Sequence, residues 1–364
     1  MDPVQQFSKT YAEARAKFLG VARARFLDVE THGLPGRHGI DGEALAMDVG
    51  LLGTAEANGI LVLTSGTHGI EGYCGSGAQI GLMNDDGFRR AAHDARVAVL
   101  FVHAVNPYGF SHGRRVNEDN VDLNRNFRDF AKPAPVNAAY ADVHPMLVPA
   151  IWPPTAENEA AIGRYLADHG ARAYQTAVTG GQYAFPDGLF YGGDRPAWSN
   201  ATLRAVLRRH ASPRRRLGWI DFHTGLGPAG HGEKIYAGRD IAPDLARARS
   251  WWGPGVTSFH DGSSASAAVT GIMCGAAYDE CHGVEYAGIA LEYGTVPLAE
   301  VLHALRADHW LHTRPAAPAA LQATIRGEMR RAFYVESDDW KERVYAQARE
   351  AAHASLRHLG RPWP

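Results

Sequence analysis

The chain has 364 residues, 45% of them hydrophobic, which is enough to bury the core of one large α/β domain. Its 37 basic and 39 acidic residues nearly balance, whereas proteins that bind nucleic acid or anionic membranes carry a basic patch, so neither partner is expected. No run of about 18 apolar residues predicts a transmembrane helix. The charged N-terminal segment lacks the apolar centre of a signal peptide, so we expect a cytoplasmic protein.

Helical and strand-like segments alternate along the chain. The first 30 residues carry apolar side chains at spacings of three and four, which predicts a helix. A predicted strand at 59–67, helix at 72–95 and strand at 95–107 form a βαβ unit, so part of the sheet should be parallel. After a proline-rich ordered loop at 132–154, the pattern predicts helices at 155–180, at 199–211 and from 300 onward, and strands at 217–225 and 287–295.

A single domain over residues 1–364 is expected, because no internal repeat or low-complexity tract divides the chain. The three cysteines form no CxxC pair and predict buried thiols rather than disulfides or a cysteine zinc site: Cys74, Cys274 and Cys281. The strands at 59–67, 217–225 and 287–295 each end in or near polar residues. Ligand sites of open α/β sheets lie outside the carboxyl ends of the strands, so a site is expected there.

An HxxE motif follows the first of these strands. His68 and Glu71 lie on a predicted turn, where an imidazole and a carboxylate could hold one face of a metal ion. A second HxxE, His282 and Glu285, follows acidic, loop-like sequence and is the weaker candidate.

The next two strands each supply one further candidate. His223 ends an apolar strand before a Gly/Pro loop and is a third potential ligand. Two nitrogens and one carboxylate with an open fourth position are typical of catalytic zinc. Glu292 follows an apolar run, so burial should raise the pKa of its carboxyl group and suit it to act as a general base. Strand capping by His223 and a salt bridge at Glu292 are the structural alternatives.

The segment 106–127, NPYGFSHGRRVNEDNVDLNRNF, has no amphipathic period and is rich in arginine and asparagine. It predicts a loop of planar donors, suited to capturing a carboxylate and polarising a carbonyl, or else a solvated polar loop.

The order of HxxE, an arginine before VDLNRNF, a strand-end histidine and a strand-end glutamate resembles the zinc carboxypeptidases of the carboxypeptidase A-like superfamily. This superfamily includes the succinylglutamate desuccinylase and aspartoacylase branch. The motifs span residues 68–292, about 60% of the chain, and VDLNRNF is the most specific of them. The resemblance implies a three-layer α/β/α sandwich with a mixed, mostly parallel sheet. Its motif-bearing core would cover about 59–300, with helical additions at both ends.

The resemblance also implies a role for each matching residue. His68, Glu71 and His223 match the ligands of one Zn²⁺ ion, although the same set could bind other divalent ions. Asp122 matches the aspartate that hydrogen-bonds the first ligand histidine. In the substrate pocket, Arg115 best matches the arginine that polarises the scissile carbonyl, with Arg114 as the alternative. The remaining matches are the carboxylate-binding pair and the general base: Asn124, Arg125 and Glu292.

These roles imply a metallohydrolase that cleaves an amide bond adjacent to a free carboxylate. The substrate would be a peptide, as for a carboxypeptidase, or a small N-acyl amino acid, as for an aspartoacylase-like deacylase. A non-catalytic binding protein on the same fold is the third hypothesis. The oligomeric state is not predicted.

Two features depart from the family pattern. Carboxypeptidases use a tyrosine shortly before the catalytic glutamate, and nothing here selects among Tyr236, Tyr278 and Tyr286. The Gly/aromatic segment 180–193 matches neither branch. It is expected to cover the site and shape the pocket, or to be a surface loop that does not contact substrate.

Overall fold

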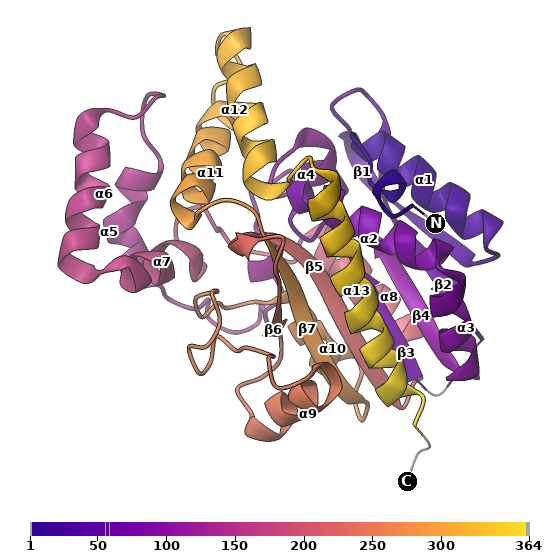
Figure 1. Ribbon diagram of the computed structural model, residues 1–364. Helices are drawn as coiled ribbons and strands as arrows, with labels where there is room; N and C mark the ends of the chain where they lie inside the picture. The colour runs from indigo at the N-terminus through magenta and orange to yellow at the C-terminus, as the bar shows by residue number, and fades with distance from the viewer. Residues whose placement is uncertain (1, 55, 58, 362–364) are drawn as a thin grey trace.

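A computed structural model describes residues 2–54, 56–57 and 59–361. Its centre is a seven-stranded sheet with helices on both faces (Figure 1). The strands are β1 (Asp28–His38), β2 (Ala44–Leu52), β3 (Gly59–Thr64), β4 (Val97–His103), β5 (Arg216–Ala229), β6 (Gly232–Tyr236) and β7 (Glu285–Gly294). The α-helices are α1 (Tyr11–Ala24), α2 (Gly72–Asn84), α3 (Asp86–Asp94), α4 (Pro107–His112), α5 (Ala138–Leu147), α6 (Ala156–His169), α7 (Ala171–Thr179), α8 (Trp198–His210), α9 (Ala242–Trp252), α10 (Ala276–Glu280), α11 (Leu298–His312), α12 (Ala319–Phe333) and α13 (Asp338–Leu359).

The strand order is β1-β2-β4-β3-β5-β7-β6. The four neighbours β4, β3, β5 and β7 pair in parallel, while the strands at both edges pair antiparallel. The predicted three-layer α/β/α sandwich with a mixed, mostly parallel sheet is therefore confirmed. Because parallel strands meet with their carboxyl ends at one edge, β3, β5 and β7 deliver their last residues to the same place.

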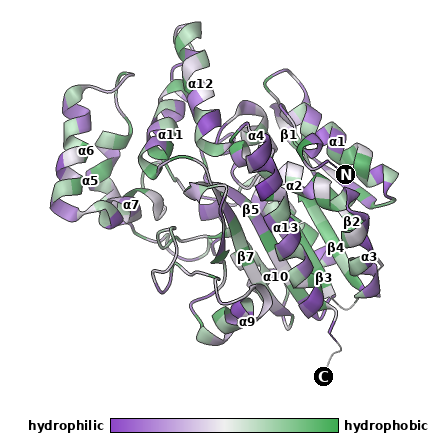
Figure 2. Cartoon of the chain, in the orientation of Figure 1, coloured by the Kyte–Doolittle hydropathy of each residue, from purple (hydrophilic) through white to green (hydrophobic). Residues whose placement is uncertain are grey.

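Each face of the sheet has its own apolar core. On β3, Leu61 and Leu63 pack with residues of α1, α2 and α13, while Ile60 and Val62 pack with α8 and α10 on the other face. A parallel strand buried on both faces is apolar at every position, which is why β3 and β4 are continuous hydrophobic runs (Figure 2).

Several predicted elements have different bounds in the structure. The predicted helix at 72–95 is two helices divided at Asp85, whose Oδ1 accepts hydrogen bonds from the backbone N–H groups of Gly87 and Phe88 and so starts α3. The predicted helix at 155–180 divides at Gly170, where a φ of 83° ends α6.

Other elements were not predicted. The first 30 residues hold α1 but also the start of β1, and the proline-rich stretch expected to be a loop contains α5, with Pro145 inside it. The hairpin of β1 and β2, strand β6 and helices α9 and α10 were also missed. All three cysteines are buried and unpaired, as expected. Within the described ranges, no helix combines the length and apolarity needed to cross a membrane.

A buried histidine at the end of β4 makes the stability of the core dependent on pH. His103 is fully buried, with Nε2 2.9 Å from Ser76 Oγ, and burial lowers its pKa to about 4. In the unfolded chain its pKa is about 6.5. Since the unfolded state takes up the proton first as the pH falls, His103 should reduce the free energy of unfolding by about 2 kcal/mol between about pH 7 and pH 4.5.

Urea unfolding of the parent and of His103→Phe at both pH values measures this effect. The variant keeps a ring against Phe18, which stacks on His103 with centroids 4.7 Å apart, but it cannot bind a proton. We expect its loss of unfolding free energy on acidification to be smaller by about 2 kcal/mol. An equal loss in both proteins would show that His103 does not titrate as described.

Candidate active site

The candidate residues converge at the carboxyl ends of three adjacent parallel strands. His68 follows β3, and Glu71 ends the single 3-10 turn after it, η2 (Gly69–Glu71). His223 in β5 and Glu292 in β7 are directly paired across the two strands. β5 lies between β3 and β7, so the sheet brings the HxxE turn, the histidine and the glutamate together.

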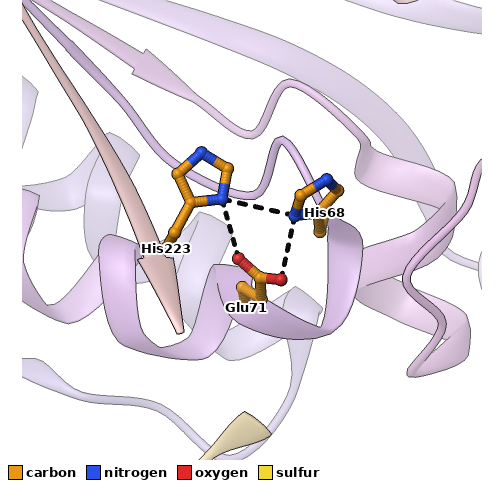
Figure 3. Close-up of side chains that lie close together, drawn as sticks. All are labelled: His68, Glu71 and His223. Atoms are coloured by element: carbon orange, nitrogen blue, oxygen red, sulfur yellow. Dashed lines mark hydrogen bonds and ion pairs between the residues drawn. The ribbon is translucent and has the colours of Figure 1, made fainter. Parts of the chain in front are cut away.

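His68, Glu71 and His223 form a compact buried cluster (Figure 3). The two Glu71 oxygens each lie 2.9 Å from an Nδ1 atom, Oε1 from that of His68 and Oε2 from that of His223. The two Nδ1 atoms are 3.3 Å apart. One ligand atom from each residue lies within 4.8 Å of the others, a spacing that suits a single metal ion.

A second carboxylate holds each imidazole from outside the cluster. His68 Nε2 lies 3.1 Å from Asp122 Oδ1, and His223 Nε2 lies 2.5 Å from Asp221 Oδ2. An ionised carboxylate only accepts hydrogen bonds, so each Nε2 donates to its aspartate, and each Nδ1 faces Glu71. Two ring nitrogens and a carboxylate therefore surround one point, an arrangement that fits a divalent metal ion.

Neighbouring charges shift the pKa of two members of the cluster, Glu71 and His223. Burial raises the pKa of Glu71, but the charges and hydrogen bonds of the two imidazoles outweigh burial and hold it below its ordinary value. Burial lowers the pKa of His223, but Asp221 and Glu71 outweigh it and raise that pKa well above the usual range. The cluster thus favours a charged carboxylate at Glu71 and positive charge at His223.

Asp221 was not singled out by the sequence analysis. Its second oxygen, Oδ1, accepts hydrogen bonds from the hydroxyl groups of Thr64 (2.7 Å) and Thr67 (2.8 Å), which fix the carboxylate against His223. The available signal was the DFH sequence, because residues two apart on a strand point to the same face of the sheet.

Arg115 bridges the two carboxylates that contact His68. Its Nε donates to Asp122 Oδ2 at 3.0 Å and its Nη1 to Glu71 Oε1 at 3.2 Å. Arg114 turns away, donating from Nε to Asp308 of α11 at 3.0 Å. Arg115 lines the site pocket and Arg114 does not, so the geometry favours Arg115 for the polarising role.

Asn124 and Arg125 also line the pocket. The buried Arg125 guanidinium donates to the Thr179 carbonyl from Nε (3.2 Å) and Nη2 (2.6 Å), and to the Asn124 carbonyl from Nη1 (2.8 Å). Asn124 Oδ1 accepts the backbone N–H of Met273 at 2.8 Å. Three of the five arginine N–H donors are thus used, and one on each Nη atom is available to a ligand.

Glu292 is 8% exposed and lines the same pocket. Its Oε1 accepts the backbone N–H of Leu226 at 3.0 Å. Burial first, and then the charge of Glu71, raise the pKa of the Glu292 carboxyl group to about 8. A carboxyl group with a pKa near neutrality can both accept and return a proton at physiological pH.

The pocket around these groups has a volume of about 100 Å³. The rest of the pocket wall consists of apolar side chains. One group of wall residues comes from β6, β7 and the intervening segment, and another from α11 and α12: Ile235, Ala237, Phe259, Val269, Ile272 and Ala290, and Leu298, Val301, Leu302, Leu305 and Phe333.

The alternative HxxE lies elsewhere. His282 is exposed, and Glu285 begins β7, at the opposite end of the strand from Glu292. Glu285 accepts a hydrogen bond from Arg216 at 3.3 Å. Among the residues that the structure describes, only His68, Glu71 and His223 form a group of three metal-binding side chains.

The three candidate tyrosines direct their hydroxyl groups to structural partners. Tyr236 lines the pocket, but its hydroxyl donates to the Arg239 carbonyl at 2.9 Å. Tyr278 donates to Asp244 and Tyr286 to the Cys274 carbonyl, both at 3.1 Å. The structure thus selects none of them for catalysis.

The 180–193 segment does contact the site. Phe190 lines the pocket, and the Tyr183 hydroxyl donates to the Arg125 carbonyl at 2.7 Å. Of the two alternatives for this segment, the structure supports the one in which it shapes the pocket.

The family model described as "Protein of unknown function (DUF2817)" matches residues 7–347. No curated protein matches the chain. Among solved structures, carboxypeptidase A from Helicoverpa armigera is 13% identical, with a TM-score of 0.48 over 89% of this chain and 74% of that one. The metallo-carboxypeptidase from Burkholderia cenocepacia is 13% identical, with a TM-score of 0.46 over 94% and 67% of the two chains. Bovine thrombin-activatable fibrinolysis inhibitor, solved with a tick carboxypeptidase inhibitor, is 12% identical, with a TM-score of 0.49 over 97% and 98%. At these scores and identities, none of the three assigns a role to any residue of this chain.

Proposed function

The chain belongs to the DUF2817 family, and we propose that this member is a metal-dependent hydrolase of amide bonds next to a free carboxylate. The observation that carries the proposal is the buried cluster of His68, Glu71 and His223, with a glutamate of raised pKa in the same pocket. Such a pairing of a metal-binding group with a proton acceptor is the minimum for metal-assisted hydrolysis.

The three cluster residues would hold one divalent ion, for which zinc is the best match to two nitrogens and one carboxylate. When bound, zinc lowers the pKa of a water molecule and polarises a carbonyl group. Asp122 and Asp221 would orient the two imidazoles by accepting hydrogen bonds from the ring nitrogens opposite the cluster.

Glu292 would move the proton. Its carboxylate accepts a proton from the attacking water and returns it to the leaving amine, which a carboxyl group with a raised pKa can do near neutral pH. The hydrogen bond from Leu226 N–H fixes one oxygen, so the other is available to the reaction.

Arg115 would stabilise the negative charge that develops on the carbonyl oxygen. Its Nε and Nη1 donate to Asp122 and Glu71, which fixes the guanidinium group in place and leaves Nη2 for the substrate. A donor positioned in advance of the reaction needs no reorganisation when the charge appears.

Arg125 and Asn124 would bind the free carboxylate of the substrate. If so, Arg125→Ala should reduce kcat/KM for a free-acid substrate about 100-fold, because a charge-assisted hydrogen-bond pair contributes about 3 kcal/mol. Hydrolysis of the matching C-terminal amide, already slow, should change only a few-fold. Both substrates are assayed on both proteins.

Arg128→Ala is the matched control, since Arg128 lies three residues further along the chain but does not line the pocket. The acid-to-amide ratio is insensitive to partial unfolding, which lowers both rates together. An equal loss of kcat/KM on the acid and the amide would show that Arg125 does not bind the carboxylate. It would also remove the main support for the proposed substrate class.

The apolar walls favour apolar groups on the substrate. A panel of dipeptides and N-acyl amino acids with apolar, acidic and basic side chains separates the carboxypeptidase from the deacylase alternative. Turnover of none of them by metal-loaded protein would favour a binding protein on this fold.

A further inference from the structure

Phe190 has a backbone conformation that is unusual for its residue type. Its φ is +55°, in the left-handed region, where an aromatic side chain is disfavoured and glycine is not. The segment is rich in glycine, with Gly188, Gly192 and Gly193 nearby, yet this position carries a large ring that is 5% exposed. Side chains held in such conformations persist where the surroundings fix them, and they gather at functional sites.

Hydrogen bonds to two successive backbone carbonyl groups, those of Phe190 and Tyr191, hold the chain at this position. The Phe190 carbonyl accepts the Gln182 N–H at 3.2 Å, and the Tyr191 carbonyl accepts the Asp122 N–H at 2.8 Å. The Gln182 side chain further binds the turn through Phe185 N–H (2.8 Å) and the Phe185 carbonyl (2.7 Å). The segment is thus fastened directly to Asp122, the residue that holds His68.

The ring lies beside both arginines of the pocket. Its centroid is 5.0 Å from Cζ of Arg115 and 5.8 Å from Cζ of Arg125, within the range of cation–π attraction. Two guanidinium groups in one buried pocket repel each other, and the electron-rich face of an aromatic ring attracts both. The ring therefore opposes a displacement of either cation from the pocket.

We propose that Phe190 is a positioning residue whose ring holds the guanidinium groups of Arg115 and Arg125 in place. The pocket can then bind the substrate carboxylate and contact its scissile carbonyl at the same time. This inference rests on the proposed function, because it concerns the same pocket. Positioning of the two arginines requires an aromatic ring at position 190, and an apolar side chain of similar volume does not suffice.

Four substitutions distinguish the effect of the aromatic ring from the effect of the strained backbone at position 190. Phe190→Tyr keeps an aromatic face, Phe190→Leu keeps apolar volume without one, and Phe190→Ala and Phe190→Gly remove both. Glycine alone adopts the left-handed φ without strain, so Phe190→Gly should melt at a higher temperature than Phe190→Ala. Their activities should nevertheless be equally low.

The readouts are kcat and KM on the free-acid and amide substrates, and the Kd of 3-phenylpropanoate, an apolar monocarboxylate, by calorimetry. We expect Phe190→Tyr to stay within about 3-fold of the parent. Phe190→Leu should lose about 10-fold in carboxylate affinity and in the acid-to-amide ratio, with an unchanged metal content.

Parental carboxylate affinity in Phe190→Leu would overturn the proposal, and so would recovery of activity in Phe190→Gly relative to Phe190→Ala. The Arg125→Ala protein distinguishes this failure from failure of the proposed function. If Arg125→Ala weakens carboxylate binding and Phe190→Leu does not, only the role of Phe190 is wrong. If neither changes the Kd, the carboxylate site itself is wrong.

Discussion

Turnover should fall by about 10²- to 10⁴-fold in Glu292→Gln, with the metal content of the parent retained. The amide keeps the size of the side chain and can still accept the Leu226 N–H bond, but it cannot take up the proton of the attacking water. The loss should appear in kcat rather than in KM, because the step affected is chemical and not binding.

Glu285→Gln is the matched control, since it makes the same substitution at the opposite end of the same strand. Initial rates on a free-acid substrate and metal analysis of each purified protein complete the experiment. Parental turnover in Glu292→Gln would show that this carboxylate is structural.

Loss of most of the bound metal is the expected result of His223→Ala, because one of the three proposed protein ligands is removed. Asp221→Asn should have a smaller effect and lower the metal affinity about 10- to 100-fold. The amide lacks the negative charge with which Asp221 orients His223 and increases its basicity. His282→Ala alters the exposed histidine of the other HxxE and should leave the metal affinity unchanged.

Chelator competition on the parent and the three variants ranks their metal affinities without any assay of activity. Stoichiometric metal at parental affinity in His223→Ala would contradict the assignment of the cluster. A parental affinity in Asp221→Asn alone would limit the error to the role of the outer carboxylate.

The parts of the fold that were predicted from sequence are those with a strong local signal. β3 and β4 have no polar residue before their last position because both faces of the sheet are covered, and such a run can be recognised from the local sequence alone. β1 gave no such signal, since only Leu34 of its eleven residues is buried. Gly170 and Asp85 lie within segments whose apolar spacing predicts one continuous helix. Gly170 ends a helix through its backbone conformation and Asp85 starts one by capping, and neither effect changes the apolar spacing.

The site divides in the same way. His68, Glu71, His223 and Glu292 lie near or just beyond the carboxyl ends of the predicted strands, so the strand pattern was enough to predict that they meet. The choice of Arg115 over Arg114 required the three-dimensional structure, because the side chains of adjacent loop residues can point in opposite directions. The left-handed conformation of Phe190 occurs where hydrogen bonds join Phe190 to Gln182 and Tyr191 to Asp122, and the local sequence does not reveal these contacts.

The two hydrogen bonds from Arg125 to the Thr179 carbonyl also have a mechanical consequence. Thr179 is the last residue of α7, so the guanidinium group caps the negative end of that helix dipole. Helices α5 to α7 lie beside the sheet rather than on it (Figure 1). If Arg125 binds a carboxylate as proposed, that carboxylate and the helix terminus share one cation, so we expect occupancy of the pocket to change amide hydrogen exchange in the last turn of α7.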